Sequence, residues 1–115
     1  MAYLALIVED VVINKWEISD EVVIMGRAKD CDIQIDDQSV SSKHARLVKE
    51  EDPYLDGESL VFLEDLKSTN GTELNGAAVD RERLRDGDLI KIGFNVFRFV
   101  SNQAKGLEDT AVIIN

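Results

Sequence analysis

The sequence predicts an all-β domain, folded as a β-sandwich of about eleven short strands. Apolar and polar residues alternate over short segments that are rich in β-branched and aromatic side chains. Gly, Asn and Asp residues separate these segments at intervals of roughly ten residues, which is the spacing of strands in a sandwich. No segment carries an apolar stripe of period 3.6 over three turns, so no helix is predicted.

Eight segments have the composition and alternation of strands. In chain order they are residues 3–9, 12–18, 21–26, 32–36, 44–50, 59–65, 88–93 and 95–100. Aromatic side chains within or beside them, including Phe94 and Phe97, are expected in the core or at a sheet edge. Residues 1–100 are predicted to form the domain. Residues 101–115 break the strand rhythm and are predicted to form a flexible C-terminal tail.

Composition limits what this domain can do. Its 115 residues are enough for one hydrophobic core, and no long apolar run or signal-peptide pattern is present, so a soluble, cytoplasmic protein is expected. The single cysteine, Cys31, can form neither an internal disulfide nor a metal site alone. A net charge of −10 argues against nucleic acid or an anionic membrane as a partner. Neither a metal nor a cofactor is expected.

The chemically informative residues lie in the connections between strands. These are "GR" at 26–27, "SVSSKHA" at 39–45 and "DLKSTNGTELNG" at 65–76. The Asn-Gly pairs at 70–71 and 75–76 indicate tight turns with positive φ. Loops that carry hydroxyl groups, an arginine and Asn side chains are typical of a binding edge for which the sandwich supplies the frame.

The chain's only histidine, His44, follows Ser41 by three positions, which raises the alternative of a small serine hydrolase. A nucleophilic serine also needs a group that orients its base and an oxyanion hole, and the sequence contains no G-x-S-x-G pattern. A structural histidine is therefore the favoured interpretation. The domain is expected not to be an enzyme.

Five motifs together resemble the forkhead-associated (FHA) domain family. They are "GR" at 26–27, "SSKH" at 41–44, "STNGT" at 68–72, "LNG" at 74–76 and "LRDGDLIKIG" at 84–93, and the resemblance covers about residues 3–100. It implies an eleven-stranded β-sandwich that binds phosphothreonine peptides on loops at one end, without catalytic activity or a cofactor. The function implied is that of an adaptor in Ser/Thr kinase signalling, whose partners are phosphothreonine-containing proteins and a kinase.

The resemblance also implies roles for individual residues. Arg27 and Ser41 would contact the phosphate, helped by Ser42 or Lys43 and by Thr69, and Asn70 would hold the peptide backbone. The residues with architectural roles would be Gly26, His44, Gly71 and Asn75. The chemistry fits, because a phosphothreonine carries about −1.5 to −2 charge and three strong acceptor oxygens. Arginine offers a planar fork of donors with a permanent charge, and Asn can both donate and accept.

Two positions bear on affinity and specificity. The family often has a basic residue or Asn directly after the phosphate-binding serine, whereas this chain has Ser42 there, followed by Lys43. A pocket with one strong cation predicts moderate, micromolar affinity. Ser39 is small and neutral, which favours an apolar over an acidic residue at the +3 position of the ligand.

The alternative function is an FHA-like module for phosphorylation-independent interaction or assembly.

The tail contains a candidate phosphorylation site. In "GLEDTAVIIN", Thr110 has Ile113 at its +3 position. The alternative is that Thr110 is incidental. The family places its termini opposite its binding loops, so a tail of about ten residues, spanning at most ~33 to 36 Å when fully extended, would have to be taut to reach its own pocket. Phosphorylated Thr110 is therefore expected to bind a neighbouring molecule and to produce self-association.

Overall fold

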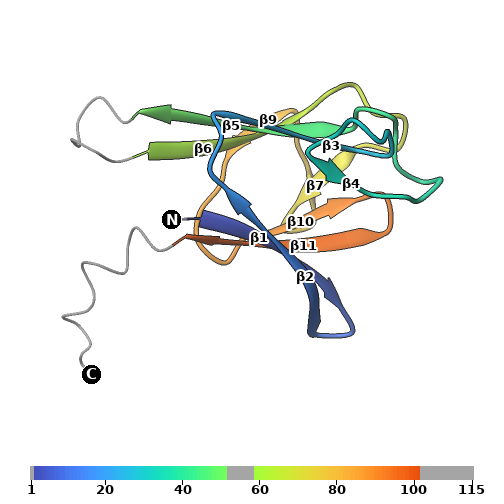
Figure 1. Cartoon of the computed structure of the whole chain (residues 1–115), viewed down its shortest axis with the longest axis horizontal. Coiled ribbons are helices and arrows are strands. Elements are labelled where there is room, and N and C mark those ends of the chain that lie inside the picture. The colour runs from blue at the N-terminus through green and yellow to red at the C-terminus, as the bar shows by residue number, and fades with distance from the viewer. Residues whose placement is uncertain (1, 52–58, 102–115) are drawn as a thin grey trace.

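The strands form two sheets. The computed structural model describes residues 2–51 and 59–101, and eleven strands lie within them (Figure 1). One sheet has six strands in the order β2-β1-β11-β10-β7-β8, and the other has five in the order β4-β3-β5-β6-β9. The strands are β1 (Ala2–Val8), β2 (Val11–Ile18), β3 (Val22–Gly26), β4 (Ile33–Gln34), β5 (Ala45–Glu51), β6 (Ser59–Asp65), β7 (Thr72–Leu74), β8 (Ala77–Ala78), β9 (Arg81–Arg83), β10 (Leu89–Ile92) and β11 (Asn95–Ser101). The predicted all-β sandwich is confirmed.

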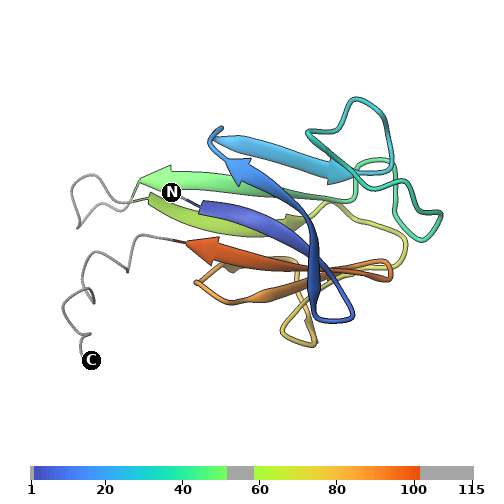
Figure 2. The same ribbon diagram turned by 60° about the horizontal axis from the view of Figure 1, so that its bottom comes forward.

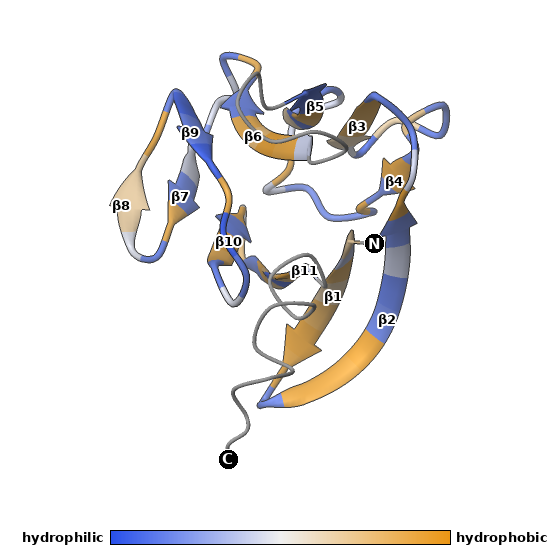
Figure 3. Ribbon diagram, turned by 90° about the vertical axis from the view of Figure 1, so that its left-hand side faces the viewer, coloured by the Kyte–Doolittle hydropathy of each residue, from blue (hydrophilic) through white to orange (hydrophobic). Residues whose placement is uncertain are grey.

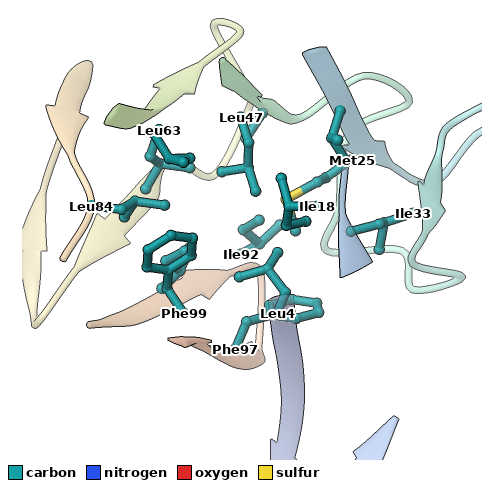
Figure 4. Close-up of a cluster of buried hydrophobic side chains, with 14 of the residues drawn as sticks. Leu4, Ile18, Met25, Ile33, Leu47, Leu63, Leu84, Ile92, Phe97 and Phe99 are labelled. Atoms are coloured by element: carbon teal, nitrogen blue, oxygen red, sulfur yellow. The ribbon is translucent and has the colours of Figure 1, made fainter. Parts of the chain in front are cut away.

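The core lies between the two sheets, and it follows from the period-2 alternation of the strands. In β10, for example, Ile90 and Ile92 are fully buried while Leu89 and Lys91 are exposed. The side chains labelled in the core of Figure 4 are Leu4, Ile18, Met25, Ile33, Leu47, Leu63, Leu84, Ile92, Phe97 and Phe99. Full burial of one such side chain stabilises the fold by about 1.5–3 kcal/mol. This core fixes the strand ends, and therefore the loops that leave them.

The structure differs from the predicted strand list in three short elements and one side chain. The strands β7, β8 and β9 were not among the eight segments recognised from their composition. Phe94, expected in the core or at a sheet edge, is instead 82% exposed in the turn between β10 and β11, so that expectation is wrong. Strand β11 includes Ser101, one residue beyond the predicted domain boundary, and residues 102–115 lie outside the described residues.

The predicted tight turns have the expected backbone. Gly71, Asn75 and Gly76 have φ values of 83°, 51° and 89°. Asn75 also fixes its turn through its side chain, because Nδ2 donates to Asp88 Oδ1 at 3.1 Å and Oδ1 accepts from the amide of Leu89 at 2.9 Å. These contacts hold the β7–β8 turn against the start of β10.

The loops after β3, β4 and β6 lie at one end of the sandwich, and the start of β1 and the end of β11 lie at the other (Figures 1 and 2). Strand pairing explains why the start of β1 and the end of β11 lie together, since Ala2 is the register partner of Ser101.

No helix of the described residues is long and apolar enough to cross a membrane. Within the same residues, no group of three or more His, Cys, Asp or Glu side chains is placed to hold a metal ion.

The β1–β2 hairpin extends beside this loop end, and the part of β2 next to its acidic turn is apolar (Figure 3). Its turn residues Glu9 and Asp10 have φ values of 51° and 66°, the pattern of a type I′ turn, which matches the twist of the two strands. The side chains of Val8, Val11 and Ile13 are 50%, 58% and 57% exposed. Strand β2 is one of the two edge strands of the six-stranded sheet, and β8 is the other.

Candidate functional site

Four connections meet at the loop end of the sandwich. They are residues 27–32 between β3 and β4, 35–44 between β4 and β5, 66–71 between β6 and β7, and 93–94 between β10 and β11. Cross-loop hydrogen bonds join them, for example from the Thr69 amide to Ser41 Oγ at 3.0 Å and from the Phe94 amide to Ser39 Oγ at 3.3 Å. The predicted motifs of the second and third loops are therefore in direct contact.

Arg27 begins the first loop and presents its charge to solvent. Its amide donates to the carbonyl oxygen of Ser41 at 3.0 Å, and its own carbonyl oxygen accepts from Gln34 Nε2 at 3.2 Å. The guanidinium group forms no ion pair or hydrogen bond with any described residue. At Gly26, a Cβ atom would overlap the carbonyl oxygen of Ser42, so only glycine allows this close approach of the two loops. The backbone of Arg27 is thus fixed while its donor fork remains available.

His44 links the second and third loops from the interior. It is fully buried, its Nδ1 accepts from the amide of Ser41 at 3.0 Å, and its Nε2 lies 2.9 Å from the carbonyl oxygen of Gly71. Both contacts are satisfied when the neutral ring carries its proton on Nε2. The imidazole faces the amide of Ser41 rather than its hydroxyl group, which instead accepts from the amide of Thr69. This geometry is that of a structural brace and not of a base beside a nucleophile.

The third loop is held by a carboxylate that the sequence reasoning did not identify. Asp65 Oδ1 accepts from Ser68 Oγ at 2.5 Å and from Thr72 Oγ1 at 2.7 Å, and Oδ2 accepts from the amide of Ser68 at 3.1 Å. Partial burial raises the pKa of Asp65, but these hydrogen bonds outweigh it and hold the pKa below its usual value. Ser68 Oγ in turn accepts from the amide of Gly71 at 3.0 Å. The Asp at the end of β6 and the Ser three residues later are the sequence signal that could have found this turn.

Thr69 and Asn70 lie at the exposed top of that loop. Asn70 Nδ2 donates to the carbonyl oxygen of Ser39 at 2.9 Å. The hydroxyl groups of Ser41, Ser42 and Thr69 donate to no acceptor among the described residues. The site therefore offers three short hydroxyl donors and one guanidinium group, on loops that are already bonded to one another.

Lys43 is placed differently from Arg27. Its Nζ pairs with Asp30 Oδ1 at 2.6 Å, and the hydrogen bond from Lys43 holds the pKa of Asp30 below its usual value. Ser42 is exposed, and its carbonyl oxygen accepts from the amide of Ala28 and from Cys31 Sγ, each at 3.2 Å. The thiol of Cys31 thus helps to hold the second loop in place.

Two further exposed cations that were not predicted, Lys29 and Lys67, flank the site and have no partner among the described residues.

A pocket of about 270 Å³, here called the front pocket, adjoins the hydroxyl groups. It is lined by Ser39, Asn70, Gly71, Glu73, Lys91, Gly93 and Phe94. The β10–β11 turn packs closely against the second loop at Gly93, which has a φ of 62°. A Cβ atom at this position would overlap Ser39 Oγ. The exposed ring of Phe94 forms an apolar wall of this pocket. The side chain of Ser39 is small, so it leaves this wall accessible.

A permanently charged side chain and short hydroxyl groups, carried on loops that are bonded to one another, are the groups with which proteins bind oxyanions. The FHA domain family model matches residues 23–93, so the chain belongs to the FHA domain family. Over 70 residues it is 39% identical to the FHA domain-containing protein FhaA of Mycobacterium tuberculosis, a match that covers 61% of this chain and 12% of that protein. Over 77 residues it is 42% identical to the ABC transporter ATP-binding/permease protein Rv1747 of the same organism, covering 67% and 8%. The chain thus spans only a small part of these relatives.

Solved structures show the same fold. One, from a study of phosphothreonine-dependent FHA domain interactions, superimposes with a TM-score of 0.73 at 30% identity and covers 87% of this chain and 95% of that one. The FhaA FHA domain in complex with the intracellular domain of Rv3910 gives a TM-score of 0.72 at 30% identity, covering 86% and 99%. Mycobacterium tuberculosis EmbR in complex with a low-affinity phosphopeptide gives 0.72 at 29% identity, covering 86% of this chain and 24% of that one.

Proposed function

We propose that this chain is a phosphothreonine-binding adaptor domain in Ser/Thr kinase signalling. The observation that carries this proposal is a set of loops joined by hydrogen bonds, from the Arg27 amide to the Ser41 carbonyl oxygen and from the Thr69 amide to Ser41 Oγ. Among the described residues, the Arg27 guanidinium has no partner, and the Ser41 and Thr69 hydroxyl groups donate to no acceptor. Arg27 supplies charge-assisted bonds to the phosphate, and the hydroxyl groups supply short neutral ones. Because the loops are already in place, little conformational entropy is lost on binding. Asn70 retains a carbonyl oxygen and an N–H for the peptide backbone.

Lys43 and Ser42 have secondary roles in this proposal. Since Lys43 pairs with Asp30, Arg27 is the principal charge on the phosphate, and micromolar affinity is expected. The Lys43–Asp30 pair is solvent-exposed and contributes little to stability, so a bound phosphate can compete for the lysine. The architectural residues Gly26, His44, Gly71 and Asn75 set the loop geometry and touch no ligand.

Its partners are phosphothreonine-containing proteins and the kinase that modifies them, in the cytoplasm, and the domain itself catalyses no reaction. Relatives whose complexes are known support this assignment, since the FhaA domain binds an intracellular domain and EmbR binds a phosphopeptide. The front pocket favours an apolar residue on one side of the phosphothreonine, because Phe94 forms its exposed wall. A phosphorylation-independent assembly module is the competing function.

Screening an oriented phosphothreonine peptide library and titrating the selected peptide by calorimetry tests the proposed function. The phosphothreonine peptide is expected to bind with micromolar affinity, and its unphosphorylated twin not to bind measurably. A matched phosphoserine peptide should bind about fivefold more weakly, because a buried methyl group is worth roughly 1 kcal/mol. Equal binding of the phosphorylated and unphosphorylated peptides would support the assembly module instead.

Thr110, outside the described residues, remains a proposed phosphorylation site. Ser101 ends β11 at the end opposite the loops, and Thr110 follows it by nine residues (110 − 101). Nine extended residues span at most about 30 Å, so self-closure requires a taut chain, whereas a neighbour's site is reached without strain. Phosphorylated Thr110 is therefore proposed to join molecules in trans and to compete with external partners.

Light scattering on protein phosphorylated at Thr110 measures this directly. Dimers or longer chains are expected, and Arg27→Ala should return the phosphorylated protein to monomers. A monomer at high concentration whose site still binds phosphothreonine peptide would reject trans association.

A further inference from the structure

A second and larger hollow lies beside the loop end, between β2 and the loop that follows β4. This side groove has a volume of about 600 Å³ and is lined by Leu6, Asn14, Trp16, Gln34, Ile35, Asp36, Asp37, Gln38, Asn95 and Phe97. Its apolar surface includes the partly buried rings and chains of Trp16 and Leu6 at the edge of the core. Trp16 lies 5.9 Å from Phe97 between ring centroids, so the indole is held against the core.

The charge of the side groove selects its occupant. Its lining includes two carboxylates and no Lys or Arg. Asp37 is engaged on both oxygens, by the amide of Ser39 at 3.0 Å and by Asn95 Nδ2 at 3.1 Å. Asp36, in contrast, is exposed and makes no hydrogen bond or ion pair with a described residue. An apolar floor with one free carboxylate suits a Lys or Arg side chain, whose stem packs on Trp16 while its head reaches Asp36.

The side groove and the front pocket are separated only by a narrow ridge. Gln38 lines the groove and Ser39 lines the pocket, and likewise Asn95 lines the groove and Phe94 lines the pocket. The two chain segments that form this ridge are bonded to each other through the Phe94 amide and Ser39 Oγ. The two hollows therefore lie close enough together for one extended peptide to reach both.

We propose that the side groove binds a basic side chain, flanked by apolar residues, of the same partner chain that carries the phosphothreonine. This inference rests on the proposed function and extends its site from a phosphate-centred pocket to a two-part surface. The second part recognises a feature of the partner that is independent of phosphorylation. In this arrangement the bound partner chain lies next to strand β2, whose Val11 and Ile13 side chains are exposed.

Trp16 is the only tryptophan of the chain, so its fluorescence reports on the side groove. The probes are a short phosphothreonine peptide and versions extended by Lys-Leu or Arg-Leu, placed stepwise further from the phosphothreonine on either side. One extended peptide is expected to bind about fivefold more tightly than the short one and to change Trp16 fluorescence, while the short peptide leaves it unchanged. Higher salt should reduce this gain.

Two variants with the same net charge separate groove binding from general attraction to an acidic protein. Asp36→Lys should abolish the gain and leave the affinity for the short peptide unchanged. The matched control is Asp20→Lys, in the exposed β2–β3 connection at the opposite end, and it should retain the gain. If Asp36→Lys does not fold, Asp36→Asn replaces it in the same titration. Equal gains in the Asp36 and Asp20 variants, or no extended peptide that alters Trp16 fluorescence, would overturn the groove proposal. Failure of the short peptide to bind the unmodified protein would instead reject the proposed function.

Discussion

Replacing Arg27 with alanine is expected to weaken phosphothreonine-peptide binding by at least tenfold. Hydrogen bonds to charged groups are worth about 1.5–3 kcal/mol, and each 1.4 kcal/mol is a factor of ten in affinity. The free energy of unfolding should change by no more than about 0.5 kcal/mol. The Arg27 side chain is exposed, and it forms no hydrogen bond or ion pair with a described residue. Calorimetric titration and thermal melting of the variant measure the two quantities.

Lys29→Ala is the matched control, because Lys29 is an exposed cation of the same loop and has no partner among the residues that the structure describes. It should weaken binding by less than about threefold, since it contributes long-range attraction alone. Arg27→Lys retains the charge but loses the planar fork, so its affinity should lie between those of Arg27→Ala and the unmodified protein. If Arg27→Ala lowers the melting temperature strongly and leaves peptide affinity intact, Arg27 is a structural residue.

Replacing His44 with alanine is expected to lower the free energy of unfolding by about 2–4 kcal/mol. The substitution leaves the partly buried amide of Ser41 and the carbonyl oxygen of Gly71 without their partner, and it opens a cavity at a fully buried position. Urea denaturation followed by Trp16 fluorescence provides the measurement. Peptide affinity should fall as well, because Ser41 and the loop ending at Gly71 lose their common brace.

Thr69→Ala serves as the control for the His44 variant, since Thr69 joins the second loop through its amide, which the substitution retains. It should leave the urea midpoint unchanged and weaken peptide binding alone. His44→Asn, which keeps one donor and one acceptor on a shorter arm, should be less destabilising than His44→Ala. An unfolding midpoint for His44→Ala equal to that of the unmodified protein would show that the buried imidazole braces nothing.

The sequence predicts those strands whose alternation is imposed by a buried face. Strand β10 is an example, with Ile90 and Ile92 inside and Lys91 outside. Strands β8 and β9 could not be predicted in this way, because each is an edge strand with every residue exposed, and so has no apolar alternation. Strand β9 is positioned by its neighbours instead: Arg81 bonds to Glu64 at 2.8 Å and stacks over the ring of Phe62. Phe94 was misplaced because an apolar ring beside a glycine turn has no periodicity from which to infer burial.

The motifs predicted which loops carry the candidate site, but not the hydrogen bonds and ion pairs within it. Motif spacing indicated that Arg27, Ser41 and Asn70 belong to three loops, and the sandwich brings those loops together. The pairing of Lys43 with Asp30 depends on how the first two loops fold against each other, which local sequence does not encode. The same holds for the side groove, because its lining residues share no motif and come from five places: β1, β2, β4, the loop after β4, and β11.

The central claim is that phosphate is bound between Arg27 and the loop hydroxyl groups, and an amide NMR titration of ¹⁵N-labelled protein with a phosphothreonine peptide tests it most directly. The largest shift changes are expected at the amides of Arg27, Ser41, Ser42, Thr69 and Asn70, and they should be absent with the unphosphorylated peptide. Shift changes confined to other surfaces, or identical with both peptides, would contradict a phosphate site at these loops.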